Sequence, residues 1–258
     1  MPDRPTERFT TRVTEYAAHR PSYPPEAIDA VVHGVPPGSW AADVGAGTGI
    51  STRLLLDRGL SVHAIEPNAA MRERAESDLQ GTRVRWHSTT GEHTGLPDAA
   101  VSLVLCAQSL HWLDPAAAVA EFARILTPGG RACALWNVHD TRDPLMASYR
   151  ELVMRHATDP PKSPWFRNDD CALGTPAAAH AGLAGDRLDT FPNRQTLDLP
   201  GLIGRAVSSS YMPQHGPARR GVERDLADLF AKHQSGGKVT LRYICEVHTA
   251  TLGRPGPA

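Results

Sequence analysis

A glycine-rich turn between a short apolar segment and a helix-forming segment restricts the folds open to this chain. Residues 40–44 form an apolar run, which is typical of a strand buried within a sheet. The run ends in the turn Asp43-Val44-Gly45-Ala46-Gly47-Thr48-Gly49. Residues 49–58 follow as a helix-forming segment that stops at Gly59. A strand, a glycine turn and a helix in this order predict one unit of an α/β sheet, with a ligand at the turn.

Strands and helices continue to alternate through the first half of the chain. Further strands are expected at residues 61–66, 84–87, 101–106 and 131–136, and helices at 24–33, 68–80 and 115–126. This alternation predicts a parallel sheet with right-handed crossovers. After residue 137 the pattern changes, with helices expected at 144–155, 202–207 and 221–232 and strands at 188–191 and 239–247. Residues 159–175 are rich in proline and polar side chains, and we expect a lid or a linker there.

Length, charge and cysteine content narrow the class of protein. The chain has 258 residues and a net charge of -1, with 27 Lys+Arg against 28 Asp+Glu. This predicts a single domain rather than two cores, and a surface that does not bind nucleic acid. The sequence shows no signal-peptide pattern and no apolar run long enough to span a membrane, and its 4 cysteines lack metal or disulfide spacing. We therefore expect a cytoplasmic protein without membrane association.

The details of the turn select among nucleotide ligands. Its glycines follow the pattern G-x-G-x-G, whereas dinucleotide-binding turns have G-x-G-x-x-G, and no Lys-Ser/Thr pair of a P-loop follows. Asp43 precedes the turn, where a carboxylate would repel a pyrophosphate and favour an ammonium group. Glu66 ends the second strand and is placed to accept hydrogen bonds from ribose hydroxyls. A ligand that joins adenosine to a cationic amino acid fits this pattern, and S-adenosylmethionine is such a ligand.

Five segments in a fixed order carry a resemblance to a known family. They are Asp43-Val44-Gly45-Ala46-Gly47-Thr48-Gly49, Ile65-Glu66-Pro67-Asn68 with Met71, Gly91-Glu92-His93-Thr94-Gly95-Leu96-Pro97, Gln108-Ser109-Leu110-His111-Trp112 and Leu126-Thr127-Pro128-Gly129-Gly130. Together they resemble the class I S-adenosylmethionine-dependent methyltransferases, and in particular the small-molecule branch near the trans-aconitate and ubiquinone-biosynthesis methyltransferases. The resemblance covers residues 9–136 and is diffuse beyond them. Relatives often have Asp where this chain has Ser102, a change for which we expect only a packing consequence.

The resemblance implies an α/β fold, a Rossmann-like three-layer sandwich. Its seven-stranded, mostly parallel sheet has an antiparallel last strand, so that residues 239–247 would insert beside the fifth strand. We expect one methyltransferase domain over residues 1–258. Within it, residues 1–35 form an N-terminal helical cover, residues 36–137 the cofactor-binding core, and residues 138–258 a substrate cap with the Pro-rich lid and the C-terminal strands.

The resemblance and the turn chemistry together suggest which residues bind the cofactor. The expected residues are Tyr16, Arg20, Asp43, Gly45, Ala46, Gly47, Glu66, Pro67, Met71, Thr90, Gly91, Glu92, Ala107 and Gln108. Arg20, in the segment 16–23, is a candidate partner for the cofactor carboxylate. Met71 contacts adenine in one interpretation and belongs to the core of its helix in the other.

The substrate pocket is expected to open beyond the fourth and fifth strands. Its candidate residues are His111, Trp112, Trp136, Asn137, Trp165 and Tyr211, each of which has packing as the alternative role. A hydroxyl or carbon acceptor requires a base, for which His111, His139 and Tyr211 are the candidates in that order. A carboxylate acceptor requires none. Asn137, His139, Asp140 and Asp143 lie close in sequence, but without evidence that they converge we predict no metal site.

The activity expected from these features is direct in-line methyl transfer to a small molecule, with S-adenosylhomocysteine as the product. A bacterial biosynthetic enzyme that acts on a secondary metabolite would fit. A cyclase or isomerase that binds the same cofactor is the alternative, while an adaptor or an RNA or protein methyltransferase is disfavoured. We expect a monomer or homodimer. The sequence leaves the methylated atom open among O, N, C and S.

Overall fold

A seven-stranded sheet forms the centre of the molecule. The computed structural model describes residues 13–158 and 172–253, and the strand order is β3-β2-β1-β4-β5-β7-β6. The strands are β1 (Trp40–Val44), β2 (Ser61–Ile65), β3 (Val84–His87), β4 (Val101–Ala107), β5 (Leu126–His139), β6 (Leu183–Leu197) and β7 (Val239–Leu252). Strands β1 to β5 pair in parallel, whereas β7 runs antiparallel to both β5 and β6. The mostly parallel sheet with an antiparallel last strand beside the fifth is therefore confirmed.

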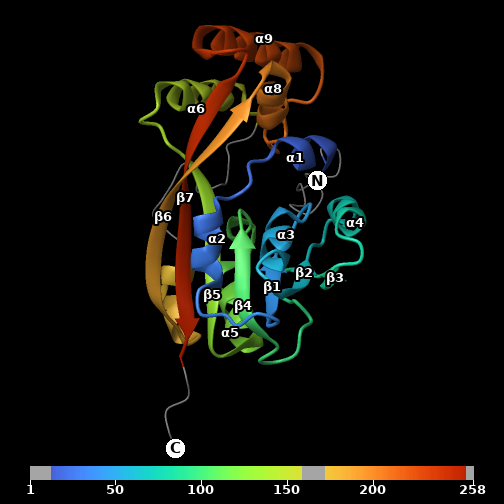
Figure 1. Ribbon diagram of the computed structural model, residues 1–258, viewed down its shortest axis with the longest axis vertical. Coiled ribbons are helices and arrows are strands. Elements are labelled where there is room, and N and C mark those ends of the chain that lie inside the picture. Colours follow the sequence, from blue (N-terminus) through green and yellow to red (C-terminus); the bar gives the residue numbers. More distant parts are fainter. Residues whose placement is uncertain (1–12, 159–171, 254–258) are drawn as a thin grey trace, which may run out of the picture.

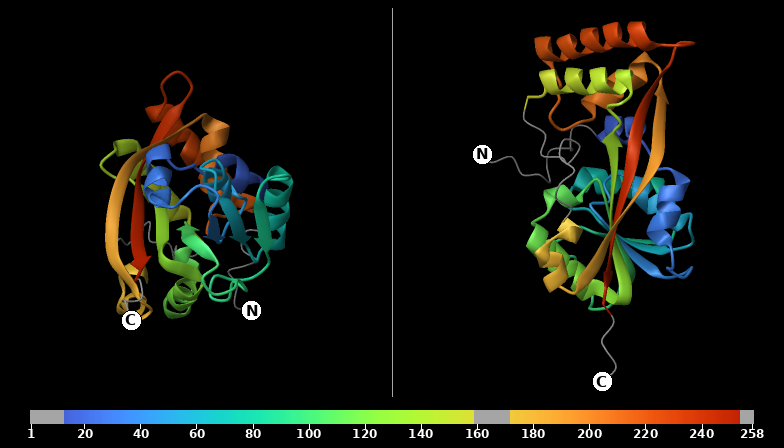
Figure 2. Two further views of the ribbon diagram at one scale, coloured as in Figure 1. Left: turned by 60° about the horizontal axis from the view of Figure 1, so that its bottom comes forward. Right: turned by 90° about the vertical axis from the view of Figure 1, so that its left-hand side faces the viewer.

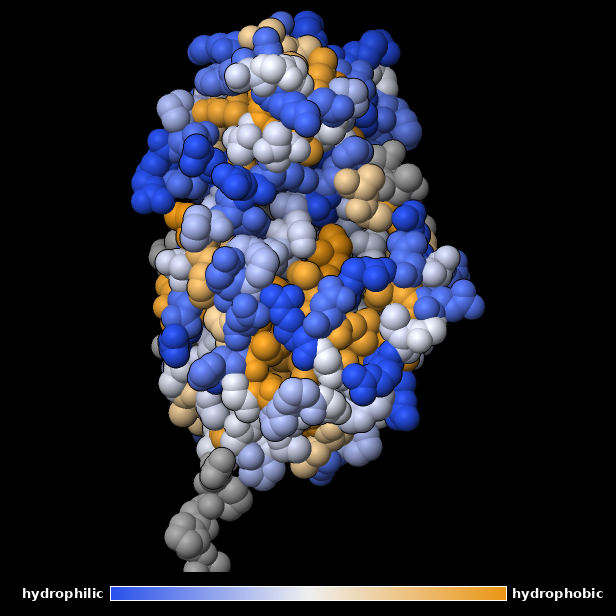
Figure 3. Space-filling view, viewed as in Figure 1, coloured by the Kyte–Doolittle hydropathy of each residue, from blue (hydrophilic) through white to orange (hydrophobic). Residues whose placement is uncertain are grey.

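Helices cover both faces of the sheet, which gives the three layers visible edge-on in the right-hand view of Figure 2. One apolar cluster joins α2 (Pro25–Val32) and α3 (Ile50–Leu56) to one face, and a second joins α5 (Pro115–Ile125) and α7 (Pro176–His180) to the other. Successive residues of the strands alternate between the two clusters, as side chains on a pleated strand must. In the space-filling view, apolar side chains show mainly over the α2–α3 layer, and hydrophilic ones predominate along the outline (Figure 3).

Long strands carry an upper helical layer above the ends of the short ones. Strands β5, β6 and β7 have 14, 15 and 14 residues, against 5 in β1. Their upper parts in Figure 1 lead to α6 (Pro144–His156), α8 (Leu199–Val207) and α9 (Gly216–His233), which we call the upper layer. A third apolar cluster joins these helices to β7. The upper layer therefore stands over the carboxyl ends of the parallel strands, where α/β sheets bind their ligands.

The N-terminal helix α1 (Val13–His19) packs tightly under α8 because of a glycine. A Cβ at Gly204 would lie 2.2 Å from the His19 ring, closer than any side chain tolerates. The Gln195 side chain also donates a hydrogen bond to the His19 carbonyl at 2.8 Å. These contacts tie the N-terminal segment to α8 and to β6 and hold it across the strand ends.

Several elements are longer than predicted, or were not predicted at all. Helices α1 and α7 were not expected, α8 and α9 begin earlier than predicted, and β5, β6 and β7 extend beyond the predicted ranges. Strand β6 lies at the sheet edge and is mostly half-buried or exposed, so polar and apolar residues are mixed along it and give little hydrophobic pattern. Pro192 is acceptable there because an edge strand has one unpaired side. Most of the predicted lid, including Trp165, lies outside the described residues.

No helix within residues 13–158 and 172–253 is both long enough and apolar enough to cross a membrane.

Helix α4 (Ala69–Asp78) lies beside β2 and β3 in Figure 1 and is the last of the helices that surround the site described next.

Candidate functional site

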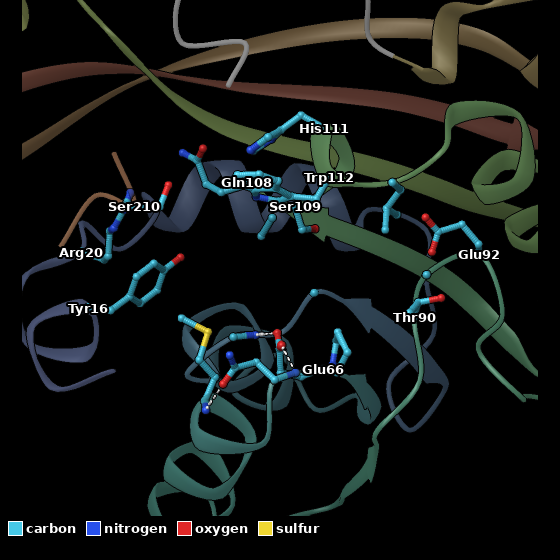
Figure 4. A pocket seen from close by; sticks show the side chains of 18 of the residues that line it. Tyr16, Arg20, Glu66, Thr90, Glu92, Gln108, Ser109, His111, Trp112 and Ser210 are labelled. Carbon is cyan, nitrogen blue, oxygen red and sulfur yellow. Dashed lines mark hydrogen bonds between the residues drawn. The ribbon is translucent and has the colours of Figure 1, made fainter. Parts of the chain in front are cut away.

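A cavity of about 320 Å³ opens at the carboxyl ends of β1, β2 and β4. Figure 4 shows the residues that surround it. They are Tyr16, Arg20, Gly45, Gly47, Glu66, Pro67, Asn68, Met71, Thr90, Gly91, Glu92, Ala107, Gln108, Ser109, His111, Trp112, Leu113, Ser210 and Tyr211. Twelve of the fourteen residues expected at the cofactor, all but Asp43 and Ala46, are among them, together with three of the six expected at the substrate.

The glycine turn supplies backbone where side chains would not fit. Gly45 and Gly47 have φ of 72° and 57°, the left-handed region that glycine adopts at little cost. A Cβ at Gly45 would lie 2.4 Å from Ser109 Cβ, because the segment after β4 crosses directly over the turn. The Ser109 hydroxyl fixes this crossing by donating a hydrogen bond to the Val44 carbonyl. A Cβ at Gly47 would instead stand in the space between Met71 and Tyr16, 3.9 and 4.0 Å from their nearest atoms.

Glu66 presents a preorganised carboxylate to the cavity. Its Oε2 accepts a hydrogen bond from the Gly47 amide and its Oε1 one from the Asn68 amide, both at 2.8 Å. Burial raises the pKa of Glu66, while these two amide bonds oppose the rise. Each carboxylate oxygen keeps a lone pair for a second donor. The arrangement therefore fits a pair of neighbouring hydroxyl groups, such as those of a ribose.

Asp43 and Ala46 do not line the cavity, although both were expected to contact the cofactor. Asp43 Oδ2 accepts hydrogen bonds from the hydroxyls of Ser51 and Thr52 at 2.8 and 2.6 Å. Burial raises the pKa of Asp43 to about 6. Ala46 is buried in the cluster beneath α2 and α3. Both residues thus support the turn from the core side, Asp43 by linking the end of β1 to the first turn of α3.

Apolar and small residues form the wall beyond Glu66. Asn68 caps α4 through a hydrogen bond from the Met71 amide to its Oδ1 at 3.0 Å, which sets Met71 against the cavity. At Gly91 a Cβ would lie 2.6 Å from both Leu113 and Val44, so any side chain there would push into this wall. Neither Asn68 nor Leu113 was among the residues predicted to border the cavity.

The end of β4 turns sharply into the cavity at Gln108. This residue has a φ of 58°, an unusual value for a residue other than glycine, and its amide donates a hydrogen bond to the Leu135 carbonyl at 2.8 Å. This change of direction brings Gln108 and Ser109 to the cavity wall, which a straight continuation of β4 would not reach. Ser109 was not among the predicted site residues, although it lies inside one of the family-like segments.

His111 lies above the turn, in the short 3-10 helix Leu110–Trp112. Its ring packs against Trp112 with centroids 4.9 Å apart, and its Nδ1 has no hydrogen-bond partner among the described residues. Burial, aided by the charge of Arg20, lowers the pKa of His111 to about 4. The imidazole is therefore neutral at pH 7 and a weaker base than an exposed histidine.

Arg20 and Tyr16 close the opposite end of the cavity. The Arg20 guanidinium stacks over the Tyr16 ring at 4.6 Å and donates a hydrogen bond to the Ser208 carbonyl at 3.2 Å. Burial lowers the pKa of Arg20, but a guanidinium keeps its charge at neutral pH. Ser210 and Tyr211 follow α8 on the same side, and Figure 4 places Arg20, Tyr16 and Ser210 together, away from Thr90 and Glu92.

Trp136, Asn137 and His139 do not line the cavity, because β5 continues within the sheet past the end of β4. Trp136 packs in the core on the α5 face, edge-on to His248 at 5.5 Å. The Asn137 side chain donates to the Ser22 carbonyl at 3.2 Å and accepts from Asn193 at 2.8 Å. The expectation that these two residues bind substrate from this cavity is not met.

His139 is buried between the rings of Tyr149 and Tyr243, with centroids 5.9 and 5.7 Å away. Burial, followed by the charges of Arg205, Arg150 and Arg20, lowers the pKa of His139 well below its usual value. His139 does not line the cavity, and the lowered pKa makes its imidazole a weaker proton acceptor, so the structure gives it no place as a base. No group of three metal-ligating side chains occurs among the described residues.

Comparison with known proteins agrees with this geometry. A family model of a methyltransferase domain matches residues 42–134. An uncharacterized methyltransferase of Mycobacterium tuberculosis is 42% identical over 147 residues, which cover 57% of this chain and 59% of that protein. A demethylmenaquinone methyltransferase of Renibacterium salmoninarum is 32% identical over 138 residues, 50% of this chain and 53% of that protein. Both alignments span less than two thirds of the relative.

A putative type II methyltransferase from Anaeromyxobacter dehalogenans superposes with a TM-score of 0.63 at 22% identity, covering 93% of this chain and 99% of that one. The fold is thus the Rossmann-like fold of methyltransferases. Residues 42–134 match a methyltransferase domain, and in sequence and fold the chain is similar to the class I S-adenosylmethionine-dependent methyltransferases. The narrower likeness to the trans-aconitate and ubiquinone-biosynthesis branch stays a prediction.

Proposed function

We propose that this protein transfers a methyl group from S-adenosylmethionine to a small molecule bound in the cavity under the upper layer. The observation that carries the proposal is the carboxylate of Glu66, oriented by the amides of Gly47 and Asn68 at the edge of the glycine turn. A buried, oriented carboxylate beside a left-handed glycine turn matches a nucleoside that bears an uncharged ribose and no pyrophosphate. The relatives named above are methyltransferases, which gives no support to the cyclase or isomerase alternative.

In this proposal, different residues of the cavity wall bind different parts of the cofactor. Glu66 accepts hydrogen bonds from the ribose hydroxyls, and Met71 and Leu113 offer apolar contact to the adenine ring. The backbone at Gly45 and Gly47 leaves room for the amino-acid part, whose carboxylate Arg20 neutralises. The cofactor supplies a methyl group bonded to a sulfonium sulfur. The residues of the chain need only hold an acceptor in line with it, and such alignment lowers a barrier by about 7–11 kcal/mol.

The acceptor side of the cavity is formed by His111, Trp112 and Tyr211. Helix α1 and the segment after α8 both border the cavity, which favours a small acceptor over a macromolecule. The relative named as a demethylmenaquinone methyltransferase supports the same choice. His111 and Tyr211 are the remaining candidates for a base if the accepting atom carries a proton. The low pKa of His111 favours an accepting atom that requires little assistance from a base.

A product analysis tests the proposal directly. The protein is incubated with methyl-labelled S-adenosylmethionine and a fractionated pool of small bacterial metabolites, and both the label and S-adenosylhomocysteine are followed by mass spectrometry. We expect label in a small-molecule fraction and an equal amount of S-adenosylhomocysteine. Cofactor consumption without label in any small molecule, or label only on protein or RNA, would contradict the proposed acceptor class.

A further inference from the structure

Tyr211 places a buried hydroxyl on the cavity wall without a hydrogen-bond partner. The side chain is 7% exposed, it lines the cavity, and its hydroxyl finds no partner within residues 13–158 and 172–253. Leaving a buried hydroxyl unpaired costs free energy, so such groups occur chiefly where a ligand or a water completes them. The phenol is well suited to donate a hydrogen bond into the cavity.

Two guanidinium groups stand close to this hydroxyl. Arg20 lines the cavity beside it, and Arg205, on α8 and 1% exposed, lies behind the wall with its Nε donating to the Tyr243 hydroxyl at 3.2 Å. Tyr211 interacts electrostatically with both arginines, and the two arginines interact with each other. Since guanidinium groups stay charged even when buried, Tyr211 lies within the electrostatic field of two positive charges.

The same two arginines also act on His139. It lies at the end of β5 between the rings of Tyr149 and Tyr243, and after burial the largest contributions that lower its pKa come from Arg205, Arg150 and Arg20. The region under α8 therefore has a positive potential that extends beyond the contacts of any single arginine. In a site removed from water, such a potential acts over several ångströms with little screening.

We propose that the methyl acceptor carries a carboxylate, which accepts a hydrogen bond from the Tyr211 hydroxyl in the positive potential of Arg205. The inference rests on the proposed function and specifies the substrate class for that site. The cofactor's own carboxylate is assigned to Arg20, so the acceptor depends mainly on Tyr211, with Arg205 strengthening the phenol as a donor. A hydrogen bond to a charged group is about twice as strong as a neutral one, so this contact selects acids over neutral analogues.

The test compares carboxylates with their primary amides, which have nearly the same size and shape. Protein saturated with S-adenosylhomocysteine is titrated calorimetrically with benzoate and benzamide and with hexanoate and hexanamide. The variants are Tyr211→Phe, which removes only the hydroxyl, and Tyr23→Phe, which removes a hydroxyl from a tyrosine buried beside α2 and outside the cavity lining. We expect the wild type and Tyr23→Phe to prefer a carboxylate by 10-fold or more, and Tyr211→Phe to lose about 10-fold of that preference.

Three results would overturn the inference. They are equal binding of acids and amides by the wild type, an unchanged preference in Tyr211→Phe, and a loss of S-adenosylhomocysteine affinity in Tyr211→Phe, which would assign the hydroxyl to the cofactor. The affinity for S-adenosylhomocysteine, measured before the probes are added, separates the two proposals. If that ligand fails to bind, the proposed function fails; if it binds and no acid is preferred, only the acceptor class fails.

Discussion

Replacing Gly45 with alanine tests how closely the segment after β4 crosses the glycine turn. The new Cβ would lie 2.4 Å from Ser109 Cβ, a distance that requires the backbone of one of the two segments to move. Alanine also has to adopt a φ of 72°, which costs about 1–2 kcal/mol for an L-residue. Overpacking at the buried contact adds about 1–3 kcal/mol. We therefore expect Gly45→Ala to lower the free energy of unfolding by about 2–5 kcal/mol.

Gly34 offers a matched control for this substitution. It has a φ of 77°, nearly that of Gly45, but a Cβ there meets no atom within 4 Å. Gly34→Ala has the same unfavourable backbone conformation and the same effect on the entropy of the unfolded chain. The difference in the free energy of unfolding between the two variants therefore isolates the contact with Ser109. Urea denaturation of both variants, followed by circular dichroism, measures that difference. Equal destabilisation of the two variants would refute the close crossing, whereas a difference of at least about 1 kcal/mol is expected.

Two further predictions concern the base and the N-terminal helix. Because burial lowers the pKa of His111 to about 4, the imidazole is already neutral at pH 6, so turnover by the wild type and by His111→Asn should have parallel pH profiles from pH 6 to 9. A rise with a midpoint near pH 6.5 that vanishes in the variant would show that His111 titrates as a base. Gly204→Ala should displace α1 from α8, because its Cβ would lie 2.2 Å from the His19 ring, and should weaken S-adenosylhomocysteine binding measured by calorimetry. The double variant Gly204→Ala/His19→Ala should recover most of that affinity, and a failure to recover would locate the defect elsewhere.

Local sequence was sufficient to predict the part of the cavity wall around the glycine turn. The glycine turn and the Asn68 cap are each formed by neighbouring residues, and Glu66 meets the turn because it follows Ile65, which pairs with Val44 in the parallel strands β1 and β2. Asp43 shows the limit of such reasoning. The sequence placed a carboxylate at the turn correctly, but only the packing of α3 reveals that Ser51 and Thr52 direct it to the core.

The part of the cavity that we propose for the acceptor depends on contacts between distant segments, which the sequence does not reveal. Strand β5 extends to His139 because β7, a hundred residues later, pairs with it along that length, and this pairing withdraws Trp136 and Asn137 from the cavity. The inclusion of Ser109 follows from the left-handed φ of Gln108, which is uncommon for glutamine and has no sequence signal. Arg205 was not predicted as part of any site, because a helix residue becomes notable only once its burial is known.

Calorimetric titration of S-adenosylhomocysteine against the wild type, Glu66→Ala and Glu73→Ala tests the central claim most directly. Glu73 is an exposed acid on α4 outside the cavity lining, so its variant controls for loss of charge near the site. Two ribose hydrogen bonds to a carboxylate are worth about 1.5–3 kcal/mol each, so Glu66→Ala should bind at least about 100-fold more weakly, while Glu73→Ala should match the wild type. Equal affinities for the wild type and Glu66→Ala would contradict the assignment of this cavity to the cofactor.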